Sequence, residues 1–97
     1  MSGVRVVVKV TARPDTVAAV KAIVLKLGTL SRKEDGCIAY EVLQEMASPA
    51  VFILVEEWSS TAALDAHNTT AHFHEAVSSA GPLLGAPLEV GRYTTIL

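Results

Sequence analysis

The sequence lacks several features that would point to particular classes of protein. Its single cysteine, Cys37, excludes an internal disulfide and favours a reducing compartment. No apolar run approaches the roughly 20 residues needed to cross a bilayer, and the N-terminus lacks the pattern of a signal peptide. The eight lysines and arginines are scattered rather than clustered, which argues against a nucleic-acid surface. We therefore expect a cytoplasmic protein that binds neither nucleic acid nor membrane.

Charge is also scarce, and apolar residues take its place. Charged residues make up 19% of the chain, below the roughly 25% of an average soluble domain, and hydrophobic residues make up 51%. A chain of 97 residues corresponds to one domain, residues 1–97, with a thin core of its own. The apolar surplus favours a second copy that covers part of the surface, so composition predicts a homodimer.

Apolar residues recur with the periods of strands and helices along the chain. Alternation predicts strands, and spacings of three and four residues predict helices. Clusters of Ser, Thr, Asn, Gly and Pro separate these segments. The predicted strands cover residues 4–10, 37–45, 51–58 and 88–97, and the predicted helices cover residues 16–33, 62–66 and 71–80.

The order of these elements predicts the fold. With the two short helices counted as one unit, it reads β-α-β-β-α-β, the ferredoxin-like α+β plan with an antiparallel sheet. Strands 4–10 and 51–58 are apolar on both faces, whereas the helices can cover only one face. We expect the second face to meet the sheet of a twin subunit, in agreement with the composition.

Three short motifs follow one another along the chain. They are Glu34-x-Gly36-Cys37-x-x-Tyr40, then Glu56-Glu57-Trp58, then Leu64-x-x-His67-x-x-Thr70-x-His72-Phe73. Together they resemble the antibiotic biosynthesis monooxygenase domain, and the resemblance covers nearly the whole chain. It implies the dimeric α+β barrel fold, and the sequence departs from the family pattern at Ala71, where proline is usual.

The same resemblance bears on cofactors. A haem-degrading branch of the superfamily needs an axial histidine, a tryptophan and an asparagine, and these positions correspond to Val77, His67 and Val8, which do not match. A metal is also disfavoured, because His67 and His72 are five residues apart with no acidic residue between them. We therefore expect neither a cofactor nor a metal.

Candidate site residues fall into a catalytic group and a binding group. His67 and His72 could each move a proton near neutral pH, although His72 could instead bond local backbone and fix the break between the short helices. Glu56 lies on a covered strand face, where a partner such as Arg92, or a raised pKa, would offset its burial. Aromatic candidates could equally be core anchors. The full set for substrate binding is Trp58, Tyr40, Phe52, Glu56, Phe73 and Arg92.

These observations favour a small cofactor-independent monooxygenase that oxidises an aromatic phenol, a quinol or a polyketide-like substrate with O₂. Its partner would be a small aromatic molecule, held in a dry pocket beside a base. An isomerase of a small carbonyl or sugar-phosphate compound would need the same groups. A non-catalytic ligand-binding module of the same fold is the third possibility, because fold alone does not define chemistry.

Overall fold

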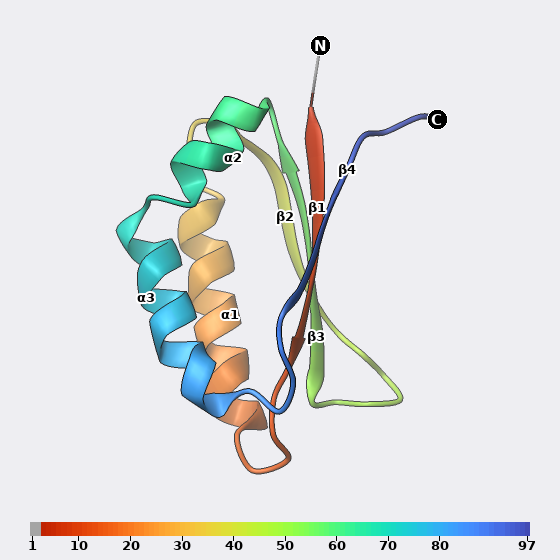
Figure 1. Cartoon of the computed structure of the whole chain (residues 1–97), viewed down its shortest axis with the longest axis vertical. Coiled ribbons are helices and arrows are strands. Elements are labelled where there is room, and N and C mark those ends of the chain that lie inside the picture. The colour runs from red at the N-terminus through yellow and green to blue at the C-terminus, as the bar shows by residue number, and fades with distance from the viewer. Residues whose placement is uncertain (1–2) are drawn as a thin grey trace.

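The computed structural model describes residues 3–97, which form a four-stranded sheet with all helices on one of its faces (Figure 1). Among these residues no helix has the length and apolarity to span a membrane. The elements are, in order, β1 (Val4–Thr11), α1 (Val17–Ser31), β2 (Cys37–Gln44), β3 (Val51–Trp58), α2 (Thr61–His67), α3 (Ala71–Ala80), the 3₁₀ helix η1 (Gly81–Leu83) and β4 (Glu89–Tyr93).

The sheet is antiparallel throughout, with strand order β2-β3-β1-β4. This confirms the ferredoxin-like α+β fold, in which the second helical unit is the pair α2 and α3. The central strands β1 and β3 pair along their whole length. The hydrophobic core lies between their inner faces and the helices, which places buried side chains of β3 directly beneath α2 and α3.

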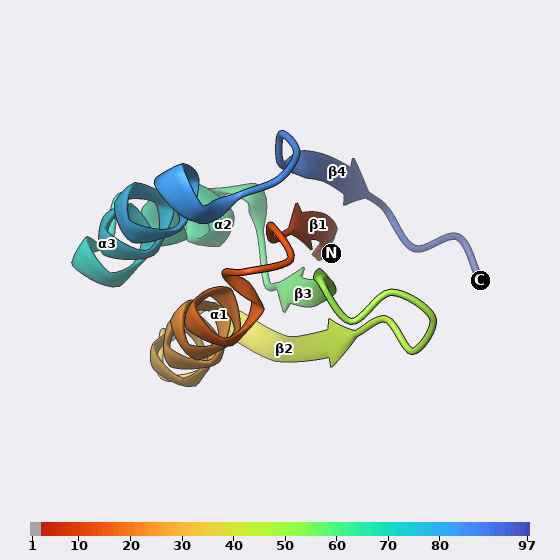
Figure 2. The same cartoon turned by 90° about the horizontal axis from the view of Figure 1, so that it is seen from below.

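Alternation along the strands separates the two faces of the sheet, as the sequence predicts. Phe52, Leu54, Glu56 and Trp58 of β3 are all buried on the helix side. The other face of the sheet has no helix over it, and Figure 2 shows this face open beyond β1 and β3. The inner face therefore holds the candidate site, while the outer face stays available for another molecule.

Small polar residues start the two short helices. The Ser60 hydroxyl accepts a hydrogen bond from the Ala63 amide (3.1 Å), and the Thr70 hydroxyl accepts one from the Phe73 amide (3.2 Å). Both are N-cap interactions of the usual kind. Thr16 precedes α1 but does not cap it with its side chain, because its hydroxyl donates to the Leu83 carbonyl instead (2.6 Å).

The last strand is shorter than the alternating pattern predicts. It ends at Tyr93 rather than Leu97, because β4 pairs only with residues 5–9 of β1. Beyond that point no strand within residues 3–97 pairs with the chain, and Ile96 and Leu97 are fully exposed. The tail extends away from the body of the domain (Figure 2). Apolar alternation was therefore not sufficient evidence for pairing at this end.

Gly36 gives the first testable prediction, because it allows α2 to pack against the turn between α1 and β2. Its carbonyl accepts a hydrogen bond from the Ser59 amide (2.9 Å), and a Cβ at this position would overlap the Cβ of Ala63. We expect Gly36→Ala to lower the free energy of unfolding by about 1–3 kcal/mol, the usual cost of overpacking. Urea denaturation at a fixed protein concentration measures it.

Two variants serve as controls for that experiment. Gly81→Ala meets no atom within 4 Å and should change stability by less than about 0.5 kcal/mol. Adding Ala63→Gly to Gly36→Ala removes the overlap, so the double variant should be less destabilised than the two single effects combined. Equal effects of Gly36→Ala and Gly81→Ala would show that the close approach of α2 does not matter.

Candidate functional site

A cavity of about 200 Å³ lies between the inner face of the sheet and the helices. Most of its wall is aliphatic, from β1, β3, α1 and α3. The polar residues that line it are Tyr40, Glu56, His67, Asn68 and Arg92. A partly open, mostly apolar hollow with a few converging polar groups is the usual form of a small-molecule site.

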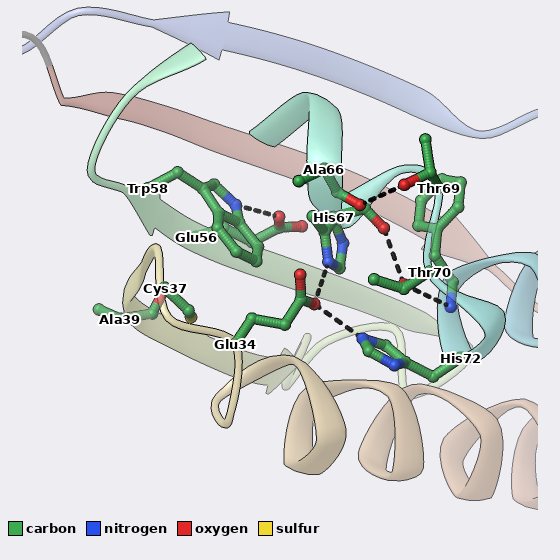
Figure 3. Close-up of polar contacts among 11 residues, drawn as sticks. Glu34, Cys37, Ala39, Glu56, Trp58, Ala66, His67, Thr69, Thr70 and His72 are labelled. Atoms are coloured by element: carbon green, nitrogen blue, oxygen red, sulfur yellow. Dashed lines mark hydrogen bonds and ion pairs between the residues drawn. The ribbon is translucent and has the colours of Figure 1, made fainter. Parts of the chain in front are cut away.

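The Glu34 carboxylate joins the two histidines that flank the helix break. One of its oxygens, Oε2, lies 2.6 Å from Nδ1 of His67 and 2.7 Å from Nε2 of His72. Figure 3 shows this carboxylate between the two imidazole rings. Both contacts have hydrogen-bond length, and a carboxylate oxygen can only accept, so both nitrogens carry hydrogen when Glu34 is ionised.

His67 is the buried member of this group, with only 2% of its side chain exposed. Its ring packs against Trp58, at 4.4 Å between centroids, and meets the edge of Phe73 at 5.2 Å. Because Nδ1 is held by Glu34, Nε2 is the nitrogen left without a protein partner within residues 3–97. A neutral imidazole in this tautomer presents Nε2 as a proton acceptor.

Thr70, rather than His72, fixes the break between α2 and α3. Its hydroxyl donates to the His67 carbonyl (2.8 Å) and also caps α3. The interpretation that His72 bonds local backbone is therefore wrong, because its ring reaches across to Glu34. The break turns the chain so that residues 67 and 72 approach one carboxylate from two helices.

Glu56 is buried beside this group, with 4% exposure. Its partner is the indole N–H of Trp58, which donates to Oε1 at 2.9 Å (Figure 3). Burial raises the pKa of Glu56, while the Trp58 hydrogen bond and the nearby His67 act in the opposite direction. No ion pair joins Glu56 to Arg92 in residues 3–97, since the two sit on strands either side of β1, each opposite Val6.

Tyr40 brings a hydroxyl to the same space. The residue is 2% exposed, and its hydroxyl oxygen is buried without a hydrogen bond of normal geometry. Burial raises the pKa of Tyr40, and the charge of Glu56 raises it further. Tyr40 therefore remains a phenol at neutral pH. Tyr40 lies opposite Glu56 in the sheet, and a hydrogen bond between the two side chains contributes to the pKa shift of each, so a bound molecule or water would compete with Glu56 for this hydroxyl.

Glu34, His67 and His72 are close enough to be considered as metal ligands, since their ligand atoms all lie within 4.8 Å of one another. A histidine nitrogen and a carboxylate oxygen that bind the same tetrahedral zinc ion would be roughly 3.3 Å apart, given metal–ligand bonds near 2.0–2.1 Å. The observed 2.6 and 2.7 Å are shorter and leave no place for an ion between donor and acceptor. The arrangement is that of a hydrogen-bonded group.

The structure brings some of the sequence-predicted residues together and separates others. Tyr40, Glu56, His67, Phe73 and Arg92 line the cavity. Trp58 supports the His67 ring from outside the cavity, Phe52 is a core residue, and His72 borders a second, smaller hollow between α1 and α3. Sequence reasoning missed two site residues, Glu34 and Asn68. Glu34 is the first residue of the first family motif, and its place in that motif could have identified it as a site residue.

Fold and site together define a class, a small ferredoxin-like α+β protein with a carboxylate–histidine pair at an apolar cavity. The family model for antibiotic biosynthesis monooxygenase matches residues 3–79, and the chain belongs to this family. The Mycobacterium tuberculosis protein Rv0793 is 35% identical over 89 residues, which cover 92% of this chain and 87% of that protein. The solved structure of Rv0793 has a TM-score of 0.93 at 29% identity, over 98% of this chain and 96% of that one.

Other relatives differ in how much of their length is matched. The Bacillus subtilis (strain 168) protein YcnE is 39% identical over 62 residues, covering 64% of this chain and 65% of YcnE. The matched segment spans only 43% of the Synechocystis protein sll1783, at 40% identity over 65% of this chain. A solved protein of Methanosarcina mazei Go1 has a TM-score of 0.89 at 32% identity, over 96% of this chain and 92% of that one.

The buried Glu56 carboxyl yields a prediction about stability and pH. A carboxyl whose pKa is raised by folding binds more protons in the native than in the unfolded state, so stability falls as pH rises from its usual pKa near 4.5 through the raised value. Glu56→Gln keeps an acceptor for Trp58 and removes this loss. We expect its stability relative to wild type to increase with pH over that interval, measured by urea unfolding with the single tryptophan as probe.

Glu57→Gln is the matched control, because Glu57 follows Glu56 in β3 but faces the outer side of the sheet. Its stability relative to wild type should stay level over the same pH range. If the stability of Glu56→Gln relative to wild type also stayed constant with pH, folding would not raise the pKa of Glu56.

Proposed function

We propose that the protein is a cofactor-independent monooxygenase that oxidises an electron-rich phenol or quinol with O₂. The observation that carries the proposal is the Glu34–His67 pair in the wall of an apolar cavity, with Nδ1 of His67 held and Nε2 left free. Membership of a family described by monooxygenase activity supports it. The substrate would be a small aromatic molecule, because the cavity is narrow and mostly aliphatic.

The first step is removal of a proton from the substrate. Nε2 of His67 accepts the hydroxyl proton, and the Glu34 carboxylate stabilises the imidazolium that forms. A carboxylate behind a histidine fixes the tautomer and the ring orientation in the same way in other enzymes that use histidine as a base. The Tyr40 hydroxyl lines the cavity opposite Glu56, and it could donate to the phenolate oxygen in place of the Glu56 carboxyl.

The second step is chemistry of the substrate itself. The electron-rich anion transfers one electron to O₂, and the two radicals combine to form a carbon–oxygen bond and a peroxide anion. When the attacked ring carbon carries one hydrogen, the peroxide anion takes the proton held by His67 and becomes a hydroperoxide. The neutral His67 then removes the remaining C–H proton, the C–H electron pair forms the carbonyl, the O–O bond breaks, and the departing hydroxide takes that proton from His67. One oxygen atom enters the product and the other leaves as water, so substrate plus O₂ gives ketone plus H₂O. The aliphatic walls offer few polar groups that would hold water beside these intermediates, and a bound substrate would fill the opening.

An isomerase would use the same base and remains the second candidate. His67 could remove a proton from the carbon next to a carbonyl group and return it elsewhere. Sugar phosphates fit this cavity poorly, because Arg92 is the one cationic side chain among its described lining residues and Glu56 lies in the same wall. A small neutral carbonyl compound is the form of isomerase substrate that the cavity favours. A non-catalytic binding module would need the cavity but not the basic Nε2.

Oxygen consumption tests the proposal. With a panel of anthrones and hydroquinones, we expect the wild type to take up O₂ and His67→Gln to be slower by about 10²–10⁴-fold, the usual contribution of a general base. His74→Gln is the matched control, because His74 is exposed on α3 and should be dispensable. Uptake is measured with an oxygen electrode after correction for uncatalysed oxidation.

Each alternative predicts a different result. An isomerase gives deuterium exchange at a substrate carbon in D₂O without O₂ uptake, and His67→Gln abolishes that exchange. A binding module shows neither reaction. Equal O₂ uptake by His67→Gln and His74→Gln would contradict the role given to His67.

We also propose that the active form is a cytoplasmic homodimer that packs through the outer face of the sheet. Val7, Ile53 and Val55 lie on this face of the central strands, and Leu43 of β2 is 48% exposed beside them. The centre of this helix-free face is an apolar strip bordered by charged residues such as Lys9 and Glu41, and a second copy of the sheet supplies a cover of matching shape. The unpaired Cys37 suits a reducing compartment.

The dimer is tested by a charge placed at its centre. We expect the wild type to sediment at twice 10.2 kDa at micromolar concentration, and Val55→Lys to sediment as a monomer, because it buries an unpaired ammonium group. Ala22→Lys adds the same charge on the exposed side of α1 and should stay dimeric. A wild-type monomer under these conditions would rule the interface out.

A further inference from the structure

The Glu34–His67–His72 group contains one carboxylate, which is negatively charged, and two imidazole rings, each of which can carry a positive charge. Both imidazoles contact the same oxygen, Oε2, so a single carboxylate serves as counter-ion for both. The ring centroids of the two histidines are only 6.0 Å apart, so two imidazolium ions would repel each other. Groups this close titrate as a unit rather than independently. One imidazolium beside this carboxylate is therefore favoured over two.

Burial decides which histidine carries that charge. His67 is 2% exposed and surrounded by aromatic rings, whereas His72 is 20% exposed at the surface between α1 and α3. An ionised imidazole loses more solvation in the first position than in the second. With one carboxylate contacting both rings at nearly equal distance, the difference in solvation places the charge on His72.

The other charged groups near each ring do not reverse this preference. His67 faces Glu56, whose raised pKa means that burial already disfavours its ionised form. His72 borders the hollow that also contains Lys26 and Glu75, and these two pair with each other at 3.2 Å. Their charges largely cancel at His72.

We propose that His72 is a positioning residue that carries the positive charge opposite Glu34 and so keeps His67 neutral, with Nε2 free to accept a proton. His72 does not line the cavity and does not touch the substrate. The importance of this arrangement for catalysis rests on the proposed function, but the location of the charge is a property of the free protein. It gives the two histidines different roles, one facing the cavity and one facing solvent.

Side-chain ¹⁵N–¹H correlation spectra at pH about 6.5, near the usual midpoint of histidine, test the location directly. In the wild type we expect His67 to have a protonated Nδ1 and a bare Nε2, and His72 to have both nitrogens protonated. His72→Gln keeps an N–H donor for Glu34 but cannot ionise. In that variant His67 should become the imidazolium, with both nitrogens protonated, while His74→Gln should leave both residues as in the wild type.

The rate profile is the second measurement. In His72→Gln the acid limb of the pH–rate curve should move to higher pH, with the rate recovering at high pH. A purely structural role of His72 would lower the rate at every pH and leave the limb in place. If the spectra match the expectation but no substrate is turned over, the charge arrangement is supported and the proposed function is contradicted. A protonated Nε2 on His67 in the wild type, or a bare one in His72→Gln, would overturn the inference itself.

Discussion

One carboxylate oxygen connects the parts of this protein that matter for its chemistry. Glu34 sits in the turn after α1, His67 ends α2 and His72 starts α3, and both histidines contact Oε2 of Glu34. Three segments of backbone are thereby fixed relative to one another by two short, charge-assisted hydrogen bonds. The break between α2 and α3 allows this convergence, because a continuous helix would point residues 67 and 72 in different directions.

The buried polar groups around this carboxylate differ in how they are satisfied. Glu56 is bonded by the Trp58 indole, and Nδ1 of His67 is bonded by Glu34. Each pairing removes much of the cost of burial. Within residues 3–97, Nε2 of His67 and the Ser31 hydroxyl have no hydrogen-bond partner, and the Tyr40 hydroxyl has only the Glu56 carboxyl opposite it. Of these groups, only those of His67 and Tyr40 belong to residues that line the cavity, whereas Trp58 does not line it.

Local patterns predicted the scaffold well, because strand and helix periods are properties of neighbouring residues. The bounds of β3 and α3 agree with the prediction, and the face of β3 that holds Glu56 was correctly assigned. The errors concern interactions between distant segments. Glu34 is 33 residues from His67 in sequence, so spacing could not join them. Of the two alternatives offered for Glu56, a partner such as Arg92 is ruled out because β1 lies between their strands, whereas a raised pKa agrees with the structure. The end of β4 was overextended because alternation does not reveal whether a partner strand continues.

The same strands that form the cavity also form the exposed outer face, and this links assembly to chemistry. Along β1, Val6 and Val8 line the cavity, while Val7 between them points to the outer side. Along β3, Glu56 faces inward and Val55 outward. A twin sheet packed on the outer face would fix the twist of β1 and β3, and with it the spacing between the cavity wall and His67 above it. For so small a core, rigidity of the site depends on what covers the other side of the sheet.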